Sequence, residues 1–312
     1  MDKETPPSAT AKHFDDTLFP DGLLWHFTKP ECLVSILKNG IRATHSAFLS
    51  DRLDGSLRNR CQRLYSDLMA AKASFKGDSG RVENAKEQFR KILNLDAAFP
   101  SFIACFVANP DFEAMWERYG LDGGIAIGIR EQFVFQKRRK TDEENVLVKF
   151  CNYHNWDSLL DAVRRTEIRV QGELKSCSTL EDVDKLCRKE IPAINEQATN
   201  LLFAKRRIFE FEHEVRLAWI LLGLNDNPQA GPGNEVDAKC DPTAKYNPKL
   251  SQENGKLFVH IPFGKQPKDW VARIIVGPYG DVDRHVASAL TIARLFGISQ
   301  EQVEMYTPPY LN

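Results

Sequence analysis

The sequence predicts an α+β fold, with a mixed, mostly antiparallel sheet as its core. Apolar runs of strand length alternate irregularly with helical segments and lack a regular βαβ rhythm. An apolar fraction of 42% and a charged fraction of 27% are typical of a folded domain. A chain of 312 residues can bury a core without metal or disulfide support. We expect a single domain over residues 21–312, preceded by a flexible polar tail over 1–20.

The domain is expected to begin with a strand over Leu23–Phe27, a short apolar run. Lys29-Pro30-Glu31 then opens a helix, and Gly40 ends it as a C-terminal glycine. Ile41–Phe48 is a second extended segment. Residues 51–98 have helical composition broken by one glycine-containing stretch, which predicts a peripheral helical hairpin inserted into the domain.

The middle of the chain predicts buried strands around a short helix. Ser101–Ala108 and Gly124–Ile129 are continuous apolar runs, typical of strands covered on both faces. Between them a short helix ends at Tyr119-Gly120, and Val146–Tyr153 alternates like a further strand.

The remaining segments are a helical segment over 157–209, a strand over Phe211–Leu222, a polar loop over 225–256, strands over Leu257–Pro262 and Val271–Val276, a helix over Val282–Phe296 and an edge strand over Val303–Tyr306.

Charge and cysteine content narrow the function classes. Forty-two basic and 43 acidic residues give a net charge of −1, which argues against electrostatic binding of nucleic acid or an anionic membrane by the surface as a whole. No stretch approaches the ~20 apolar residues of a membrane helix, and the first residues lack a signal-peptide apolar region. Seven scattered cysteines without a Cys-x-x-Cys pair argue against a disulfide framework and a zinc ribbon. We expect a cytoplasmic protein with no metal site and no membrane partner.

The common catalytic motifs are absent, but a first polar constellation lies at the end of the first strand. His26 and Thr28 share one face there, because strand side chains alternate with period two. Such a pair can bind a sugar or a phosphate. The alternative is a buried histidine that hydrogen-bonds to the backbone.

A second constellation is the short helix that contains Met115, Trp116 and Tyr119. Met115 and Tyr119 are four residues apart and lie on one helical face. An aromatic side chain beside a sheet can stack on a planar ring, so Trp116 and Tyr119 are candidate cofactor contacts. The alternative is a helix that only packs the core.

A third constellation is Glu212, Glu214 and Arg216, which would alternate onto one face of a strand that continues as apolar Leu217–Leu222. Burying a carboxylate costs several kcal/mol unless it is paired, so these charges require a reason. One glutamate can pair with Arg216, which leaves the other for chemistry. The alternative is a solvated face of an edge strand.

Taken in order, these residues resemble the bacterial domain-of-unknown-function family 2971 over nearly the whole chain. The matching motifs are His26-x-Thr28, Leu49-Ser-Asp51, Cys105-Phe106, Met115-Trp116-x-x-Tyr119-Gly120, Gly124-x-x-Ile127-Gly128, Lys205, Glu212-x-Glu214-x-Arg216 and Ile274-Ile275-x-Gly277-Pro278. The family often has Asn-Asp-Pro-x-Glu where this chain has Ser50-Asp51-Arg52-Leu53-Asp54, so a helix N-cap is an alternative role for Asp51.

The layout is more distantly similar to the ADP-ribosyltransferase fold of His-Tyr-Glu type. That resemblance implies NAD as substrate, with Glu214 or Glu212 as the catalytic carboxylate and His26 as a second catalytic residue. His26 and Thr28 would also hold the dinucleotide. The resemblance further implies that Tyr119 packs on the nicotinamide. Arg216 or Lys205 would orient Glu214 or meet a phosphate.

The leading hypothesis is therefore an NAD-dependent ADP-ribosyltransferase-like enzyme that transfers ADP-ribose to a macromolecular acceptor, protein or nucleic acid, or to water. The resemblance also suggests a toxin or defence role. A non-catalytic nucleotide-binding or interaction module of the same fold is the main alternative. A metal-dependent hydrolase using Glu212, Glu214 and Asp51 is a third.

Overall fold

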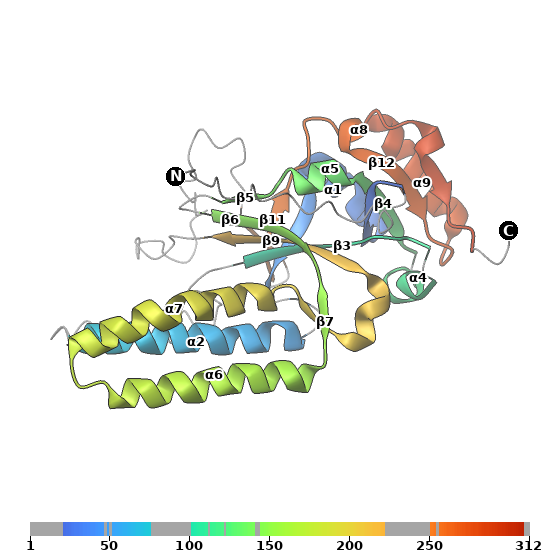
Figure 1. Cartoon of the computed structure of the whole chain (residues 1–312). Helices are drawn as coiled ribbons and strands as arrows, with labels where there is room; N and C mark the ends of the chain where they lie inside the picture. The colour runs from blue at the N-terminus through green and yellow to red at the C-terminus, as the bar shows by residue number, and fades with distance from the viewer. Residues whose placement is uncertain are drawn as a thin grey trace, which may run out of the picture.

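The computed structural model describes residues 21–46, 49, 52–75, 101–111, 113–121, 123–140, 144–221, 250–253 and 256–308. The expected tail over 1–20, the second half of the helical hairpin and most of the expected polar loop lie outside these residues. The described part has the predicted α+β fold with a mostly antiparallel sheet (Figure 1).

The strands are β1 (Leu23–Thr28), β2 (Ile41–His45), β3 (Ser101–Val107), β4 (Ile125–Arg130), β5 (Arg139–Lys140), β6 (Glu144–Phe150), β7 (Asn152–His154), β8 (Ala204–Arg206), β9 (Glu214–Leu221), β10 (Leu250–Glu253), β11 (Lys256–Ile261), β12 (Val271–Val276) and β13 (Val303–Met305). The α-helices are α1 (Leu33–Asn39), α2 (Arg52–Phe75), α4 (Glu113–Tyr119), α5 (Glu131–Phe135), α6 (Trp156–Ser176), α7 (Leu180–Leu201), α8 (Pro267–Trp270) and α9 (Val282–Leu295). Three 3-10 segments are η2 (Pro30–Cys32), η4 (Arg207–Glu212) and η6 (Gln300–Gln302).

The main sheet branches at β3. Its longest path runs β10-β11-β2-β3-β1-β4-β12-β13, and β9, β6 and β5 continue from the other edge of β3. One edge of β3 pairs along its whole length with β9. The opposite edge is shared, because Phe102 and Ile103 pair with β2 whereas Val107 pairs with Trp25 of β1. The sheet therefore splits between β1 and β2.

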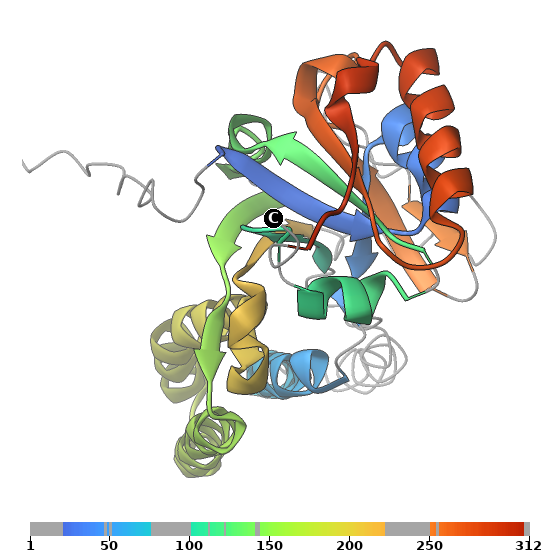
Figure 2. The same cartoon turned by 90° about the vertical axis from the view of Figure 1, so that its right-hand side faces the viewer.

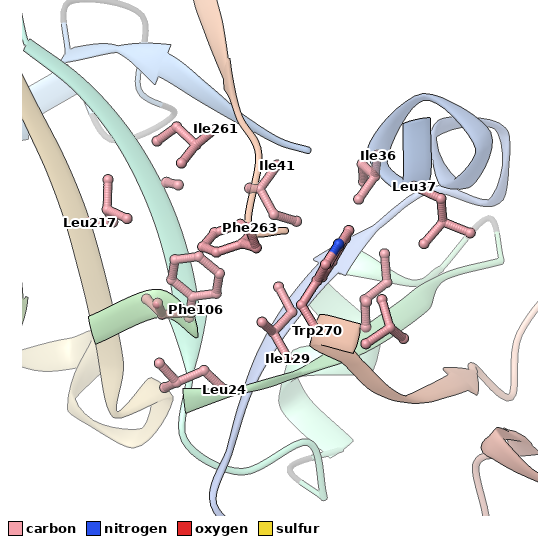
Figure 3. Packing of buried hydrophobic residues seen from close by; sticks show 14 of the residues in the cluster. Leu24, Ile36, Leu37, Ile41, Phe106, Ile129, Leu217, Ile261, Phe263 and Trp270 are labelled. Carbon is pink, nitrogen blue, oxygen red and sulfur yellow. The ribbon is translucent and has the colours of Figure 1, made fainter. Parts of the chain in front are cut away.

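One face of the sheet, the upper face in Figure 1, holds the main core. Leu24, Phe106 and Leu217 point to this face from β1, β3 and β9. Helix α1 adds Leu33, Ile36 and Leu37, and Trp270 of α8 closes the cluster (Figure 3). Gly40 ends α1 with φ at 98°, and a side chain there would collide with the Ile261 carbonyl, so the tight turn into β2 needs glycine.

The opposite, lower face is covered by α4 and by a bundle of three helices (Figure 2). Helices α2, α6 and α7 share a separate apolar cluster built around residues such as Leu64, Val163 and Leu186. The described half of the expected insertion therefore packs on the helical segment after residue 156, away from the main core. Leu202 and Phe203, just after α7, join the bundle to Ile103 and Ala218 of the sheet.

Several predicted element boundaries are wrong. The strand expected over Val146–Tyr153 is divided at Cys151 into β6 and β7. The strand expected over Phe211–Leu222 begins at Glu214, because residues 207–212 form η4 and His213 adopts a left-handed backbone with φ at 41°. The helical segment expected to extend to residue 209 ends at Leu201 and is followed by β8. The expected loop over 225–256 contains β10, which pairs with β11.

Candidate functional site

Four buried ionisable side chains meet on the lower face, where the sheet contacts the end of the bundle. Lys205 Nζ donates to Glu212 Oε2 at 2.5 Å and also to Glu214 Oε2. Arg216 Nε donates to Glu214 Oε1 at 2.5 Å. Each of the four side chains is exposed by 5% or less. We call them the buried ion cluster: Lys205, Glu212, Glu214 and Arg216.

The backbone explains why these residues converge. Glu214 and Arg216 are two residues apart on β9 and share its lower face, opposite Val107 and Cys105 of β3. Glu212 precedes the strand and reaches the same ammonium because His213 turns the chain with a left-handed backbone. The alternation expected from the sequence is therefore not what brings Glu212 in. β9 lies between β3 and β6, so a solvated edge strand is also excluded.

Contacts around Glu214 fix its position. Its backbone N–H donates to the Tyr153 hydroxyl at 2.7 Å, and the Cys151 thiol lies 3.7 Å from Oε1. Arg216 is held in turn, because its Nη1 donates to the Leu202 carbonyl at 2.8 Å. The carboxylate is thus oriented by partners from β6–β7, β8 and the end of α7.

Burial and charge act in opposite directions on the two carboxylates. Burial alone would raise the pKa of Glu214, but Arg216 and Lys205 outweigh it and lower that pKa to about 2. For Glu212 burial outweighs Lys205 and Arg118, so its pKa is raised. Burial would lower the pKa of Lys205, but the two glutamates outweigh it and raise that pKa. Glu214 therefore stays ionised although water is nearly excluded.

The short helix α4 connects this cluster to the surface. Arg118 Nη1 donates to Glu212 Oε1 at 3.0 Å. Tyr119 is 38% exposed, and burial of its hydroxyl followed by the charge of Glu212 raises its pKa to about 12. Trp116 is fully buried against Phe27 and donates its indole N–H to the Pro110 carbonyl. Trp116 is therefore a core residue, not an accessible cofactor contact, whereas Tyr119 can meet a ligand.

His26 and Thr28 are not brought to the ion cluster. Trp25 pairs directly with Val107, and Val107 with Glu214, so these three side chains point to the lower face. His26 and Thr28 alternate with Trp25 and point to the upper face. His26 Nδ1 donates to the Cys105 carbonyl at 3.0 Å, close to where the sheet splits. Burial lowers the pKa of His26, so the ring is neutral near pH 7.

Three residues of the site were missed from the sequence: Arg118, Cys151 and Tyr153. Arg118 stands inside the Met115–Gly120 motif, and its signal was the charge next to Tyr119. Cys151 and Tyr153 reach Glu214 only because β6 pairs with β9, which no local pattern reveals.

Within the described residues, no three His, Cys, Asp or Glu side chains are grouped as a metal site requires. In the same residues, no helix combines the length and the apolar character needed to cross a membrane. No family model matches the chain, and no curated protein or solved structure is detectably similar to it.

Proposed function

We propose that this protein binds NAD and cleaves the nicotinamide–ribose bond as an ADP-ribosyltransferase-like enzyme. The observation that carries the proposal is Glu214, a carboxylate kept ionised at the start of β9 with almost no access to water. The order of elements gives further support. A strand with His26, a helix ended by Gly40, and a later short helix with Tyr119 all precede that strand, as the resemblance requires.

The chemistry suits such a carboxylate. As the C–N bond to nicotinamide breaks, its electron pair leaves with the nicotinamide and positive charge develops on the ribose, as in glycoside hydrolysis. A preorganised negative charge stabilises that state more strongly away from water. A nucleophile of a macromolecular acceptor, or water, then bonds to the ribose carbon and loses a proton. Glu214 or Glu212 is the proposed catalytic carboxylate, and Tyr119 stacks on the nicotinamide.

The structure changes the roles proposed for His26 and Thr28. Because they face away from Glu214, a single ligand cannot lie against both faces of the sheet at β3. We assign His26 a positioning role, since its ring supplies a hydrogen bond to Cys105 where the pairing of β3 passes from β1 to β2. Thr28 stays on the upper face with it.

A non-catalytic nucleotide-binding or interaction module is the second candidate, and one observation favours it. Both oxygens of Glu214 are already bonded, by Lys205 and by Arg216. A carboxylate so fully paired can support a fold or a bound ligand without doing chemistry.

The deciding assay is nicotinamide release from NAD, with and without cell extract as a source of acceptor. Losing one well-placed electrostatic group typically costs about 10²–10³ in kcat, and we expect this of Glu214→Gln. Glu212→Gln should cost less. The matched control is Glu190→Gln in α7, which makes the same change at a buried, cation-paired carboxylate of the bundle.

Equal rates for Glu214→Gln and Glu190→Gln would remove the catalytic assignment. Wild type that binds NAD without cleaving it would favour the binding module. Hydrolase activity that needs a divalent metal and no NAD would favour the third reading of the sequence.

A further inference from the structure

We propose that Arg118 is the site's contact for a phosphate group of the ligand, and that it leaves Glu212 to make that contact. The inference rests on the proposed function in taking a nucleotide as the ligand, and it adds which residue recognises the phosphate.

Among the described cations that form or contact the buried ion cluster, Arg118 is the one that reaches solvent. Its side chain is 34% exposed, whereas Glu212 beneath it is 1% exposed. Lys205 and Arg216 are exposed by 5% and 3%. An incoming anion therefore meets Arg118 before any other cation of this group.

The charges around Arg118 favour an anion. Among the described residues, the ion pairs of this group connect three cations, Arg118, Lys205 and Arg216, with two carboxylates, Glu212 and Glu214. The Arg206 guanidinium lies close by, 4.9 Å from the centre of the Phe209 ring on which Arg118 also packs.

The guanidinium is held in place but keeps unused donors. Its central carbon lies 4.3 Å from the Phe209 ring centre and 5.5 Å from that of Tyr119. Among the described residues its one hydrogen-bond acceptor is Glu212 Oε1, reached through Nη1. Arginine carries five N–H donors in a planar fork that matches phosphate oxygens in pairs. Two flanking rings, spare donors and exposure are what bidentate phosphate binding needs.

The exchange would also open the carboxylate. When the guanidinium turns to a phosphate, Glu212 keeps Lys205 on Oε2, and Oε1 becomes free to accept a hydrogen bond from a ligand hydroxyl. One movement at the surface would thus bind the phosphate and present a buried oxygen to the ribose.

The test is calorimetric titration of the full chain with ligand pairs that differ by phosphate. Nicotinamide mononucleotide is compared with nicotinamide riboside, and ADP with adenosine. Because hydrogen bonds to charged groups contribute about 1.5–3 kcal/mol, Arg118→Gln should weaken both nucleotides by roughly tenfold to a hundredfold. Its effect on the two nucleosides should stay within twofold. Arg118→Lys should retain part of the nucleotide affinity, since it keeps the charge without the fork.

Arg207→Gln is the matched control, because Arg207 is 79% exposed in η4 and its described ion pair is with Glu210. It removes the same charge nearby without touching the cluster and should change each affinity less than twofold. A comparable loss of nucleotide affinity in Arg207→Gln would mean that any nearby positive charge attracts the nucleotide, and this would overturn the proposal. Equal losses of affinity for nucleotide and nucleoside in Arg118→Gln would also overturn it. So would a wild-type protein that binds each nucleotide no more tightly than the matching nucleoside.

The two proposals fail in different ways. Arg118-dependent ADP binding without NAD cleavage would keep the phosphate contact and reject the enzyme. NAD cleavage with an unchanged KM in Arg118→Gln would keep the enzyme and reject the contact. Thermal unfolding of each variant shows that it is folded at the temperature of titration, and Arg118→Lys replaces Arg118→Gln if the latter is not.

Discussion

Two buried glutamates of this protein look alike and differ in their surroundings. Glu190 in the bundle and Glu214 in the sheet are 2% and 4% exposed, and each is bonded to two cations. The partners of Glu190 are Arg169 and Lys189, whose side chains are 46% and 61% exposed. The partners of Glu214 are 5% and 3% exposed. Only the sheet site has taken both signs of charge out of water.

That difference separates a structural ion pair from a site that requires another explanation. The side chains of Arg169 and Lys189 stay about half exposed to water, so their attraction to Glu190 costs these cations less desolvation and is screened like other surface pairs. Removing ions from water costs several kcal/mol each, and well-packed apolar residues often stabilise a fold as well as a buried pair does. Stability alone therefore does not account for the cluster, which is why we connect it with function.

The largest effect is expected when the central cation of the buried ion cluster, Lys205, is removed. Lys205→Met leaves Glu212 without its buried partner and Glu214 with Arg216 alone. Breaking a buried pair from one side costs about 3–5 kcal/mol, because the remaining charge is uncompensated. We expect this loss in the free energy of unfolding, measured with urea at pH 7. A loss below about 1 kcal/mol, the range of surface pairs, would make the two glutamates equivalent.

The second test uses pH. The folded-state pKa of Glu214 is about 2, below its ordinary value, so its contribution to stability is present above that ordinary value and is lost as pH falls toward 2. The pKa of Glu212 is raised, so the pH dependence of its contribution to stability has the opposite sign. That contribution is present at low pH and is lost as pH rises through the folded-state pKa. Glu214→Gln should therefore flatten the acid side of the stability curve, by up to about 3 kcal/mol between pH 4.5 and 2. Urea unfolding across that range measures it.

If the free energy of unfolding fell equally steeply with decreasing pH in wild type and in Glu214→Gln, the low pKa of Glu214 would be contradicted. Glu212→Gln is the internal control, since its change should have the other sign.

The third test uses salt. Arg169→Met removes a half-exposed partner of Glu190 and should cost about 1 kcal/mol, because Lys189 and water still reach the carboxylate. Raising NaCl from about 0.05 M to about 0.5 M should shrink that cost, since the Debye length falls below about 5 Å. The cost of Lys205→Met should not change with salt. Equal salt dependence of the two losses would remove the distinction between the sites.

The sequence predicted the sheet well because its strands are apolar runs bounded by turns. β12 has the predicted bounds, β1 and β3 differ from theirs by one residue at one end, and β4 differs by one residue at each end. The residues that carry charge were also identified, since Glu212, Glu214, Arg216 and Lys205 do meet. The reason given for Glu212 was wrong, because the left-handed turn at His213 is a backbone choice that no periodicity shows.

Long-range pairing is what the sequence could not supply. The resemblance to ADP-ribosyltransferases implied that His26 and Glu214 contact one NAD molecule. Whether they share a face depends on which residue of β1 meets Val107, and a shift of one residue would have put His26 on the lower face. The same holds for Tyr153, which reaches Glu214 only through the register of β6 on β9.

The smallest expected effect is on Tyr119, and it tests whether the surface and the cluster communicate by charge. The pKa of Tyr119 is raised to about 12 by burial first and by the negative charge of Glu212 second, while Lys205 and Arg118 oppose the rise. Glu212→Gln removes a negative charge and should lower the pKa of Tyr119. Arg118→Gln removes a positive charge and should raise it. Each shift should be below about one unit, because Tyr119 is partly solvated.

The measurement is an ultraviolet titration of phenolate formation. The chain has seven tyrosines, so the curve of a Tyr119→Phe protein is subtracted from that of each variant to isolate Tyr119. Circular dichroism at every pH shows that the fold persists, and Glu190→Gln should leave the curve unchanged because it lies in the bundle. Shifts of the same sign for Glu212→Gln and Arg118→Gln would point to a packing change instead of charge. Opposite signs would establish that a ligand at Tyr119 is within the electrostatic reach of the buried carboxylate, which the proposed catalysis requires.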